Sequence, residues 1–134
     1  MSEVAKPRAD MRTPMSRVYG LGSAKAGTDH FIGQRVTAIA LVPLVLIFLV
    51  GLITHAGAGY EEVRGWIASP MGAAPLLLLL LAGFYHMRLG MQVVIEDYIH
   101  SEGLKLALLL ANTFWAVAAG VACLWAVLKI SFGA

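Results

Sequence analysis

The sequence predicts an all-α integral membrane protein with three transmembrane helices, and two observations predict this class. Of its 134 residues, 59% are hydrophobic and only 13% are charged, whereas about a quarter of the residues in soluble domains are charged. Three stretches, at about 31–53, 71–96 and 104–128, are predominantly apolar and long enough to cross a hydrocarbon core, which needs about 20 residues of helix. Residues 29–134 are therefore expected to form one membrane domain.

The segment before the first span, residues 1–28, is basic and contains prolines and glycines without hydrophobic periodicity. It is expected to be extended or disordered for much of its length. Because it lacks the apolar stretch and small-residue cleavage site of a signal peptide, it is expected to persist as a cytoplasmic lead-in. The single cysteine, Cys123, lies in the third span, which excludes an internal disulfide and a cysteine-based metal site.

The second span has an unusual composition. A polar connection, residues 55–69, precedes it, and Tyr60 and Trp66 within this connection are expected to anchor at the lipid headgroups. The uninterrupted apolar part of the span stops at Tyr85, which is too short to cross a membrane. The helix must therefore continue to about Ile95, which places polar side chains inside the membrane: those of His86, Arg88 and Gln92.

Lysine and arginine residues are distributed unevenly between the two sides of the predicted membrane domain. If the N-terminus is inside, Arg64 and Lys129 lie outside and the other eight lie inside: Lys6, Arg8, Arg12, Arg17, Lys25, Arg35, Arg88 and Lys105. Basic residues accumulate on the cytoplasmic side of membrane proteins. The N-terminus and the loop between the second and third spans are therefore expected in the cytoplasm, and the C-terminus in the periplasm of a bacterial inner membrane.

The stretch from His86 to His100 carries the most chemical information. On a helix, one stripe follows spacings of three and four and consists of Gly83, His86, Gly90, Val93 and Asp97. The two glycines beside His86 allow a flat cofactor or a partner helix to come close. A histidine inside a membrane is costly and indicates function. The residues alone leave haem ligation, a hydrogen bond across the bundle and proton relay open.

Other polar residues have two interpretations each. Arg88, Gln92 and Glu96 form a second stripe, turned away from His86, which fits a solvated or mutually paired face. Arg35, just inside the first span, fits either snorkelling to the headgroups or pairing with an anionic cofactor group.

Asp97 and Tyr98 follow His86 by eleven and twelve residues, about 16 to 18 Å along a helix. This separation places both residues at the cytoplasmic interface. A tyrosine hydroxyl there fits either a hydrogen bond to a quinone carbonyl, beside a carboxylate that tunes local protonation, or simple interfacial anchoring.

These residues resemble a known family. The pattern of a membrane histidine, eleven residues, and then Asp97-Tyr98 is similar to the smaller membrane anchor subunit of succinate dehydrogenase, respiratory Complex II. The start of the first span, HFIGQRVTAI, resembles the Arg-x-Thr-Ala-Ile entry of that family at Arg35, Thr37, Ala38 and Ile39. The resemblance runs from about Gly27 to the C-terminus and is strongest to the alphaproteobacterial and mitochondrial branch.

The resemblance implies a non-catalytic subunit of succinate:ubiquinone oxidoreductase in the respiratory chain and tricarboxylic acid cycle. It implies that His86 is one axial ligand of the iron of a b-type haem, with the other from a cytochrome b anchor subunit that completes a six-helix bundle. It also implies that Tyr98, with Asp97 beside it, binds ubiquinone as substrate, and that Arg35 pairs with a haem propionate. The implied partners are this cytochrome b subunit, an iron–sulfur subunit, a flavoprotein subunit and the lipid bilayer, with no nucleic acid.

Two other functions compete with this interpretation. One is a haem-free structural anchor, in which His86 only packs and Tyr98 only anchors. The other is a small transporter or channel subunit, which the intramembrane arginine and histidine favour, although no span has a paired acidic residue deep within it.

Overall fold

The computed structural model describes residue 15 and residues 23–133 of the chain. These residues form four helices and no strands: α2 (Ser23–Thr54), α3 (Tyr60–Ala68), α4 (Pro70–Tyr98) and α5 (Glu102–Ser131). Most of the N-terminal segment expected to be extended lies outside the described residues, but α2 already begins at Ser23, before the predicted start of the first span. The prediction of an all-α membrane protein is confirmed.

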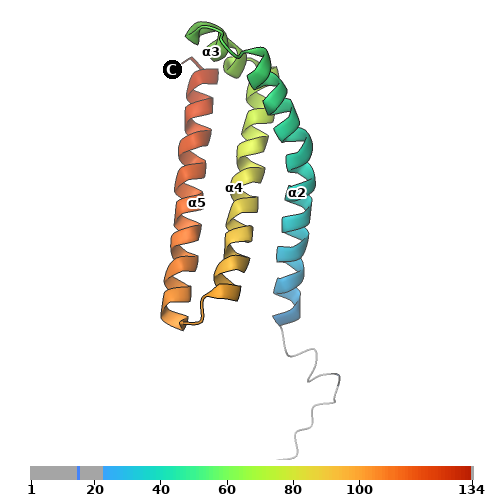
Figure 1. Ribbon diagram of the computed structural model, residues 1–134, viewed down its shortest axis with the longest axis vertical. Helices are drawn as coiled ribbons and strands as arrows, with labels where there is room; N and C mark the ends of the chain where they lie inside the picture. Colours follow the sequence, from blue (N-terminus) through green and yellow to red (C-terminus); the bar gives the residue numbers. More distant parts are fainter. Residues whose placement is uncertain (1–14, 16–22, 134) are drawn as a thin grey trace, which may run out of the picture.

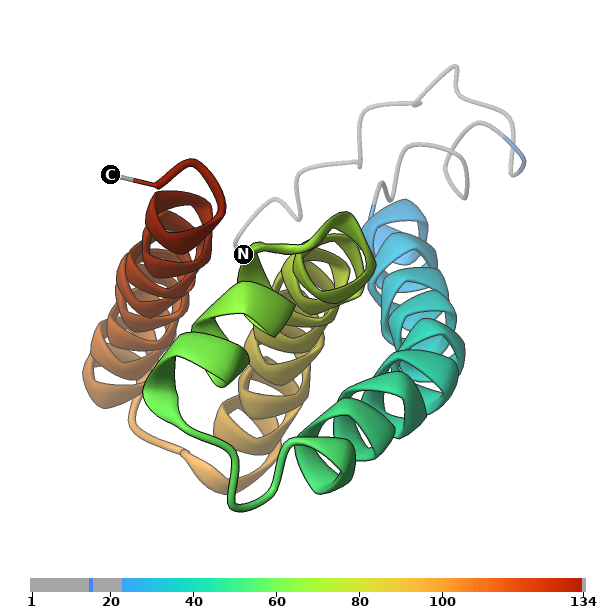
Figure 2. The same ribbon diagram turned by 90° about the horizontal axis from the view of Figure 1, so that it is seen from above.

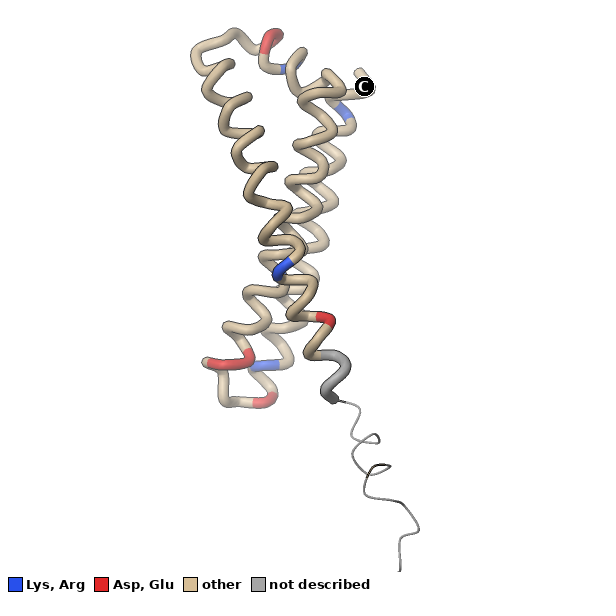
Figure 3. The backbone as a smooth tube through the Cα atoms, turned by 90° about the vertical axis from the view of Figure 1, so that its right-hand side faces the viewer, with Lys and Arg blue, Asp and Glu red and all other residues tan. Residues whose placement is uncertain are grey.

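The three long helices have the length and composition of membrane spans. The candidate spans are Gly27–Thr54, Pro70–Tyr98 and Glu102–Ser131, with 28, 29 and 30 residues. A helix of 29 residues is about 43 Å long, which exceeds the ~30 Å hydrocarbon core. In Figure 3 the acidic residues lie at the two ends of the bundle and the shaft between them is almost entirely uncharged.

The long helices form one open layer with α4 in the middle. Helix α4 packs against α2 on one side and against α5 on the other, whereas α2 and α5 make no contact within the described residues. Figure 1 shows the three helices side by side, and Figure 2 shows from above that they form an open arc. Both outer faces of this layer are therefore available to lipid or to other chains.

The burial pattern agrees with an open layer. No side chain in the described part of the chain is fully buried, and the core consists of Ala73, Leu89, Ile95, Ala116 and Val127 together with Gly72 and Gly120. Small residues at these positions allow close helix contact, as is usual between helices in membranes. Phe84 of α4 covers Gly120 of α5, where an added Cβ would lie 3.4 Å from the Phe84 ring.

The polar connection at 55–69 folds into the short helix α3, which the sequence did not predict. Gly57 makes the turn into it with a positive φ of 84°, a conformation that glycine adopts at little cost. Ser69 ends α3 and caps α4, because its hydroxyl donates to the Trp66 carbonyl at 2.7 Å and accepts from the Gly72 amide at 3.1 Å. Pro70 follows at the first position of α4, where a missing amide proton costs nothing.

Trp66, which the sequence predicts to lie at the headgroups, packs against the C-terminal end of α2 and the start of α4. Its ring stacks on His55 with a centroid separation of 4.8 Å and an interplanar angle of 19°. A Cβ added at Gly51 would collide with the same ring, and one at Gly72 would collide with the Trp66 backbone carbonyl. Tyr60, at the start of α3, remains exposed as an interfacial anchor requires.

Candidate functional site

Helix α4 continues through the polar residues of the second span, as the sequence predicts, and brings His86 against α2. The Nδ1 atom of His86 lies 3.0 Å from the Thr37 hydroxyl, and its Nε2 atom lies 3.5 Å from the Gln34 side-chain nitrogen. His86 is sixteen residues from the start of α4 and twelve from its end, about 18 Å from the nearer end. The imidazole therefore lies deep in the bundle.

The hydrogen bonds of Thr37 favour one of the two neutral forms of the His86 ring. The Thr37 hydroxyl donates to the Gly33 carbonyl at 2.7 Å, with the Gln34 carbonyl at 3.2 Å. A hydroxyl has one proton, so a Thr37 hydroxyl that donates to the Gly33 carbonyl can only accept a hydrogen bond from His86. In this arrangement Nδ1 of His86 carries the proton and Nε2 holds the free lone pair.

The glycines beside His86 admit the chain's own helix α2. A Cβ added at Gly90 would lie 3.4 Å from the Gln34 side-chain nitrogen, and one at Gly83 would lie 3.9 Å from Leu41. Gly33 of α2 is equally close to α4, because its added Cβ would lie 3.2 Å from the Tyr85 hydroxyl. Of the two interpretations of this glycine-flanked face, close approach of a helix is thus realised within the chain.

An apolar groove opens beside His86. Its volume is about 440 Å³, and its other lining residues all come from α2: Ala38, Leu41, Val42, Val45 and Leu46. Several of these side chains are well exposed, with 63% of Val42 accessible. The groove is therefore a surface that a second chain or a bound group would cover.

Gln34 leaves one polar group without a partner. Its side-chain oxygen is buried and makes no hydrogen bond within the described residues. Its nitrogen makes only the 3.5 Å contact with His86, which is long for a hydrogen bond. A buried polar group without a partner costs about 1–3 kcal/mol, so this position is incompletely satisfied next to the imidazole.

Arg35 lies on the same stripe of α2 as the groove residues Ala38, Val42 and Val45, which follow it at successive spacings of three, four and three. It is exposed, and its guanidinium carbon lies 4.7 Å from the centre of the Phe31 ring. It makes no ion pair within the described part of the chain. Its positive charge is therefore available at the end of the groove that lies toward the α4–α5 loop.

The second polar stripe divides into two parts. Gln92 donates to Glu96 at 2.8 Å, as expected for a mutually paired face. Arg88, however, turns to α5, where its Nε donates to the Thr113 hydroxyl at 3.3 Å and its carbonyl accepts from Asn112 at 2.9 Å.

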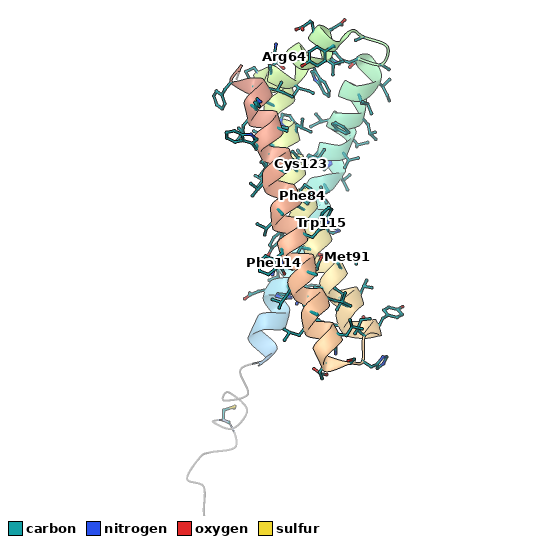
Figure 4. The ribbon with its side chains drawn as sticks, turned by 90° about the vertical axis from the view of Figure 1, so that its left-hand side faces the viewer. Arg64, Phe84, Met91, Phe114, Trp115 and Cys123 are labelled. Atoms are coloured by element: carbon teal, nitrogen blue, oxygen red, sulfur yellow. The ribbon has the colours of Figure 1, made fainter. Side chains whose placement is uncertain are left out.

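Asp97 and Tyr98 lie at the end of α4, next to the loop into α5. Tyr98 is 75% exposed and borders a second apolar groove of about 560 Å³ between α4 and α5, with Met91, Asn112 and Trp115 on its walls. Figure 4 shows Met91 and Trp115 at similar heights on these two helices, with Cys123 farther along α5. The groove of Tyr98 and the groove of His86 are thus on opposite sides of α4.

Sequence reasoning missed four residues of these contacts. Gln34 and Thr37 are polar positions three residues apart in an apolar span, and this spacing signals a shared helix face toward a polar partner. Asn112 and Thr113 similarly interrupt the third span. Among the described residues, no three His, Cys, Asp or Glu side chains are close enough together to hold a metal ion.

Comparison with known proteins decides the family. The succinate dehydrogenase/fumarate reductase transmembrane subunit family matches residues 9–120. The chain belongs to this family. Within it, the succinate dehydrogenase hydrophobic membrane anchor subunit of Rickettsia bellii is 35% identical over 88% of this chain and 94% of its own. The corresponding subunit of Paracoccus denitrificans is 31% identical over 91% of this chain and 94% of its own.

Family membership confirms the resemblance seen in the motifs. The chain is a multi-pass succinate dehydrogenase membrane anchor, and the competing interpretation as a small transporter or channel subunit loses its support.

Proposed function

We propose that this anchor subunit supplies His86 as one axial ligand of a b-type haem and Tyr98, with Asp97, as part of a ubiquinone site. The assignment of His86 as a haem ligand rests on the hydrogen bonding of its ring. When the Thr37 hydroxyl accepts a hydrogen bond from Nδ1, the lone pair is on Nε2, and a metal requires that lone pair.

The surroundings of His86 fit a haem. The groove beside the ring is apolar and open to a second chain, which suits a macrocycle held between two subunits. Gln34 holds Nε2 only weakly, so its amide can turn away when iron takes that position. When bound, the haem supplies a one-electron carrier inside the membrane.

The second haem ligand must come from elsewhere. The other described histidines, His30, His55 and His100, lie toward the ends of the bundle, far from the depth of His86. A cytochrome b anchor subunit that covers the groove and contributes its own histidine satisfies this requirement and completes a six-helix bundle. Arg35, at one end of the same stripe, would pair with a haem propionate, because a guanidinium binds a carboxylate with two parallel hydrogen bonds.

The quinone part of the proposal rests on Tyr98. Its exposed hydroxyl lies at the end of the α4–α5 groove, where an apolar ring system can enter between the helices. The hydroxyl would donate to a quinone carbonyl, and the Asp97 carboxylate beside it would influence protonation at the same surface. Electrons would reach this site from succinate through a flavoprotein subunit and an iron–sulfur subunit on the cytoplasmic side of a bacterial inner membrane.

The haem content of the purified complex tests the haem proposal. Dithionite-reduced minus oxidised spectra should show a low-spin b-type haem in a ratio of one per copy of this chain. A complex that contains this chain, flavin and iron–sulfur clusters but no haem would instead support a haem-free anchor, in which the Gln34–His86 contact is permanent.

A further inference from the structure

The hydroxyl of Thr37 has two hydrogen-bonding roles in one place. It donates to the Gly33 carbonyl one turn earlier at 2.7 Å, and it lies 3.0 Å from Nδ1 of His86 on the neighbouring helix. A threonine inside a helix commonly donates its hydroxyl proton to the backbone carbonyl one turn earlier, and this hydrogen bond fixes the χ1 rotamer of the threonine. The acceptor lone pairs of the hydroxyl are therefore held in a fixed direction, toward the imidazole.

We propose that Thr37 is a positioning residue that fixes the proton of His86 on Nδ1 and the orientation of its ring for metal ligation. This inference rests on the proposed haem ligation by His86. Histidines that bind metals typically donate their other N–H to an oxygen, which sets the tautomer and raises the basicity of the ligand. Thr37 supplies that oxygen from α2, the helix that also forms the groove.

The close packing of α2 on α4 makes this arrangement specific. A Cβ added at Gly33 of α2 would lie 3.2 Å from the Tyr85 hydroxyl of α4. One added at Gly90 of α4 would lie 3.4 Å from the side-chain nitrogen of Gln34 in α2. The two helices are thus too close for the imidazole to rotate freely, and no other described side chain makes a hydrogen bond with Nδ1. Removing the hydroxyl leaves the Nδ1 proton inside the membrane without an acceptor.

The proposal predicts a change in the haem itself. A hydrogen bond from Nδ1 makes the imidazole a stronger electron donor and stabilises the ferric iron, so losing it should raise the midpoint potential of the haem. Weaker haem retention, by roughly tenfold to hundredfold, is also expected, since this is the usual effect of removing such a partner.

The experiment compares variants in the whole purified complex by redox titration of the haem and by low-temperature electron paramagnetic resonance. Thr37→Val, which keeps the shape of the side chain, should raise the potential and shift the low-spin signal. Thr37→Ser, which keeps the hydroxyl, should match the parent. Thr113→Val is the control, because it removes an intramembrane threonine hydroxyl on the α5 side of α4.

Several outcomes would overturn the inference. Parent-like potential and resonance in Thr37→Val would do so, as would a Thr37→Ser complex shifted as far as the valine variant. If Thr37→Val does not assemble, Thr37→Ala is read by the same criteria. Failure of the haem proposal is distinguishable, because then the parent complex contains no haem or His86→Ala leaves the haem spectrum unchanged.

Discussion

His86 and Arg88 are two residues apart on α4 but contact opposite neighbours. His86 lies against Thr37 of α2, whereas Arg88 donates to Thr113 of α5 at 3.3 Å. Residues two apart on a helix are about 200° apart around its axis, so α4 separates the two side chains. Arg88 therefore lies on the wrong side of α4 to pair with a haem bound at His86, whereas Arg35 shares a stripe with the groove.

This difference makes two arginines distinguishable by redox titration. Arg35→Met should lower the midpoint potential of the haem. A nearby positive charge disfavours the oxidised haem, which is the more positively charged form, so removing that charge stabilises the oxidised form relative to the reduced form. Arg88→Met should leave the potential unchanged. A larger shift for Arg88 than for Arg35 would show that the arginine paired with the haem has been assigned incorrectly.

Tyr98→Phe tests the quinone site, since it removes the hydroxyl and keeps the ring. Losing a hydrogen bond to a carbonyl in a partly dry site costs on the order of 1 to 3 kcal/mol, so ubiquinone reduction at limiting quinone should fall by roughly tenfold or more. Succinate oxidation with a soluble acceptor should hardly change, because the proposal assigns that step to the partner subunits.

Tyr60→Phe is the matched control for this experiment. Tyr60 is as exposed as Tyr98, at 76% against 75%, but lies at the opposite end of the bundle on α3 (Figure 1). It should retain full ubiquinone reductase activity. Equal activity of the two variants would reduce Tyr98 to an interfacial anchor.

Substitutions at two glycines test the packing of α3 against α4 at the α3 end of the bundle. Gly72→Ala should destabilise the assembled complex by about 1–3 kcal/mol, because the new methyl would collide with the Trp66 backbone. Gly65→Ala, in the middle of α3 with open space around it, should be neutral or stabilising by up to about 1 kcal/mol. Thermal inactivation of the purified complex measures both, and an equally stable Gly72→Ala complex would contradict the described packing.

The sequence predicted the architecture because membrane spans are determined by composition and length alone. It also predicted that α4 must continue through His86 and Arg88, since the apolar part was too short to cross. Helix α3 was missed because its nine residues carry charge and glycine and have no strong apolar period. Residue type placed Trp66 at the end of the bundle, but it did not predict that the turn at Gly57 would stack this ring on His55.

The site was predicted only in part, for a physical reason. Helical spacing identifies which residues share a face, and so it separated His86 from Arg88. It does not identify which helices meet, and the contacts of His86 with Thr37 and Gln34 join residues 49 and 52 positions apart. Such pairings depend on the order of the helices in the layer, which the pattern of one span does not contain.

The orientation of the chain can be tested independently of any cofactor. The start of α2 and the α4–α5 loop share one end of the bundle, and α3 and the C-terminus share the other (Figure 1). Because the basic residues favour the first end as cytoplasmic, a phosphatase fused after Ala134 should be active in the periplasm, and a fluorescent protein fused there should be dark. The reverse pattern would invert the proposed topology.

The haem spectrum of a His86→Ala complex, with haem measured per flavin, tests the central claim most directly. The expected result is loss of the low-spin b-type signal, while His100→Ala, an exposed histidine in the α4–α5 loop, retains it. If the alanine complex assembles poorly, His86→Met should retain haem at a higher potential, because methionine is a weaker ligand that favours ferrous iron. An unchanged bis-histidine spectrum in either His86 variant would contradict the assignment.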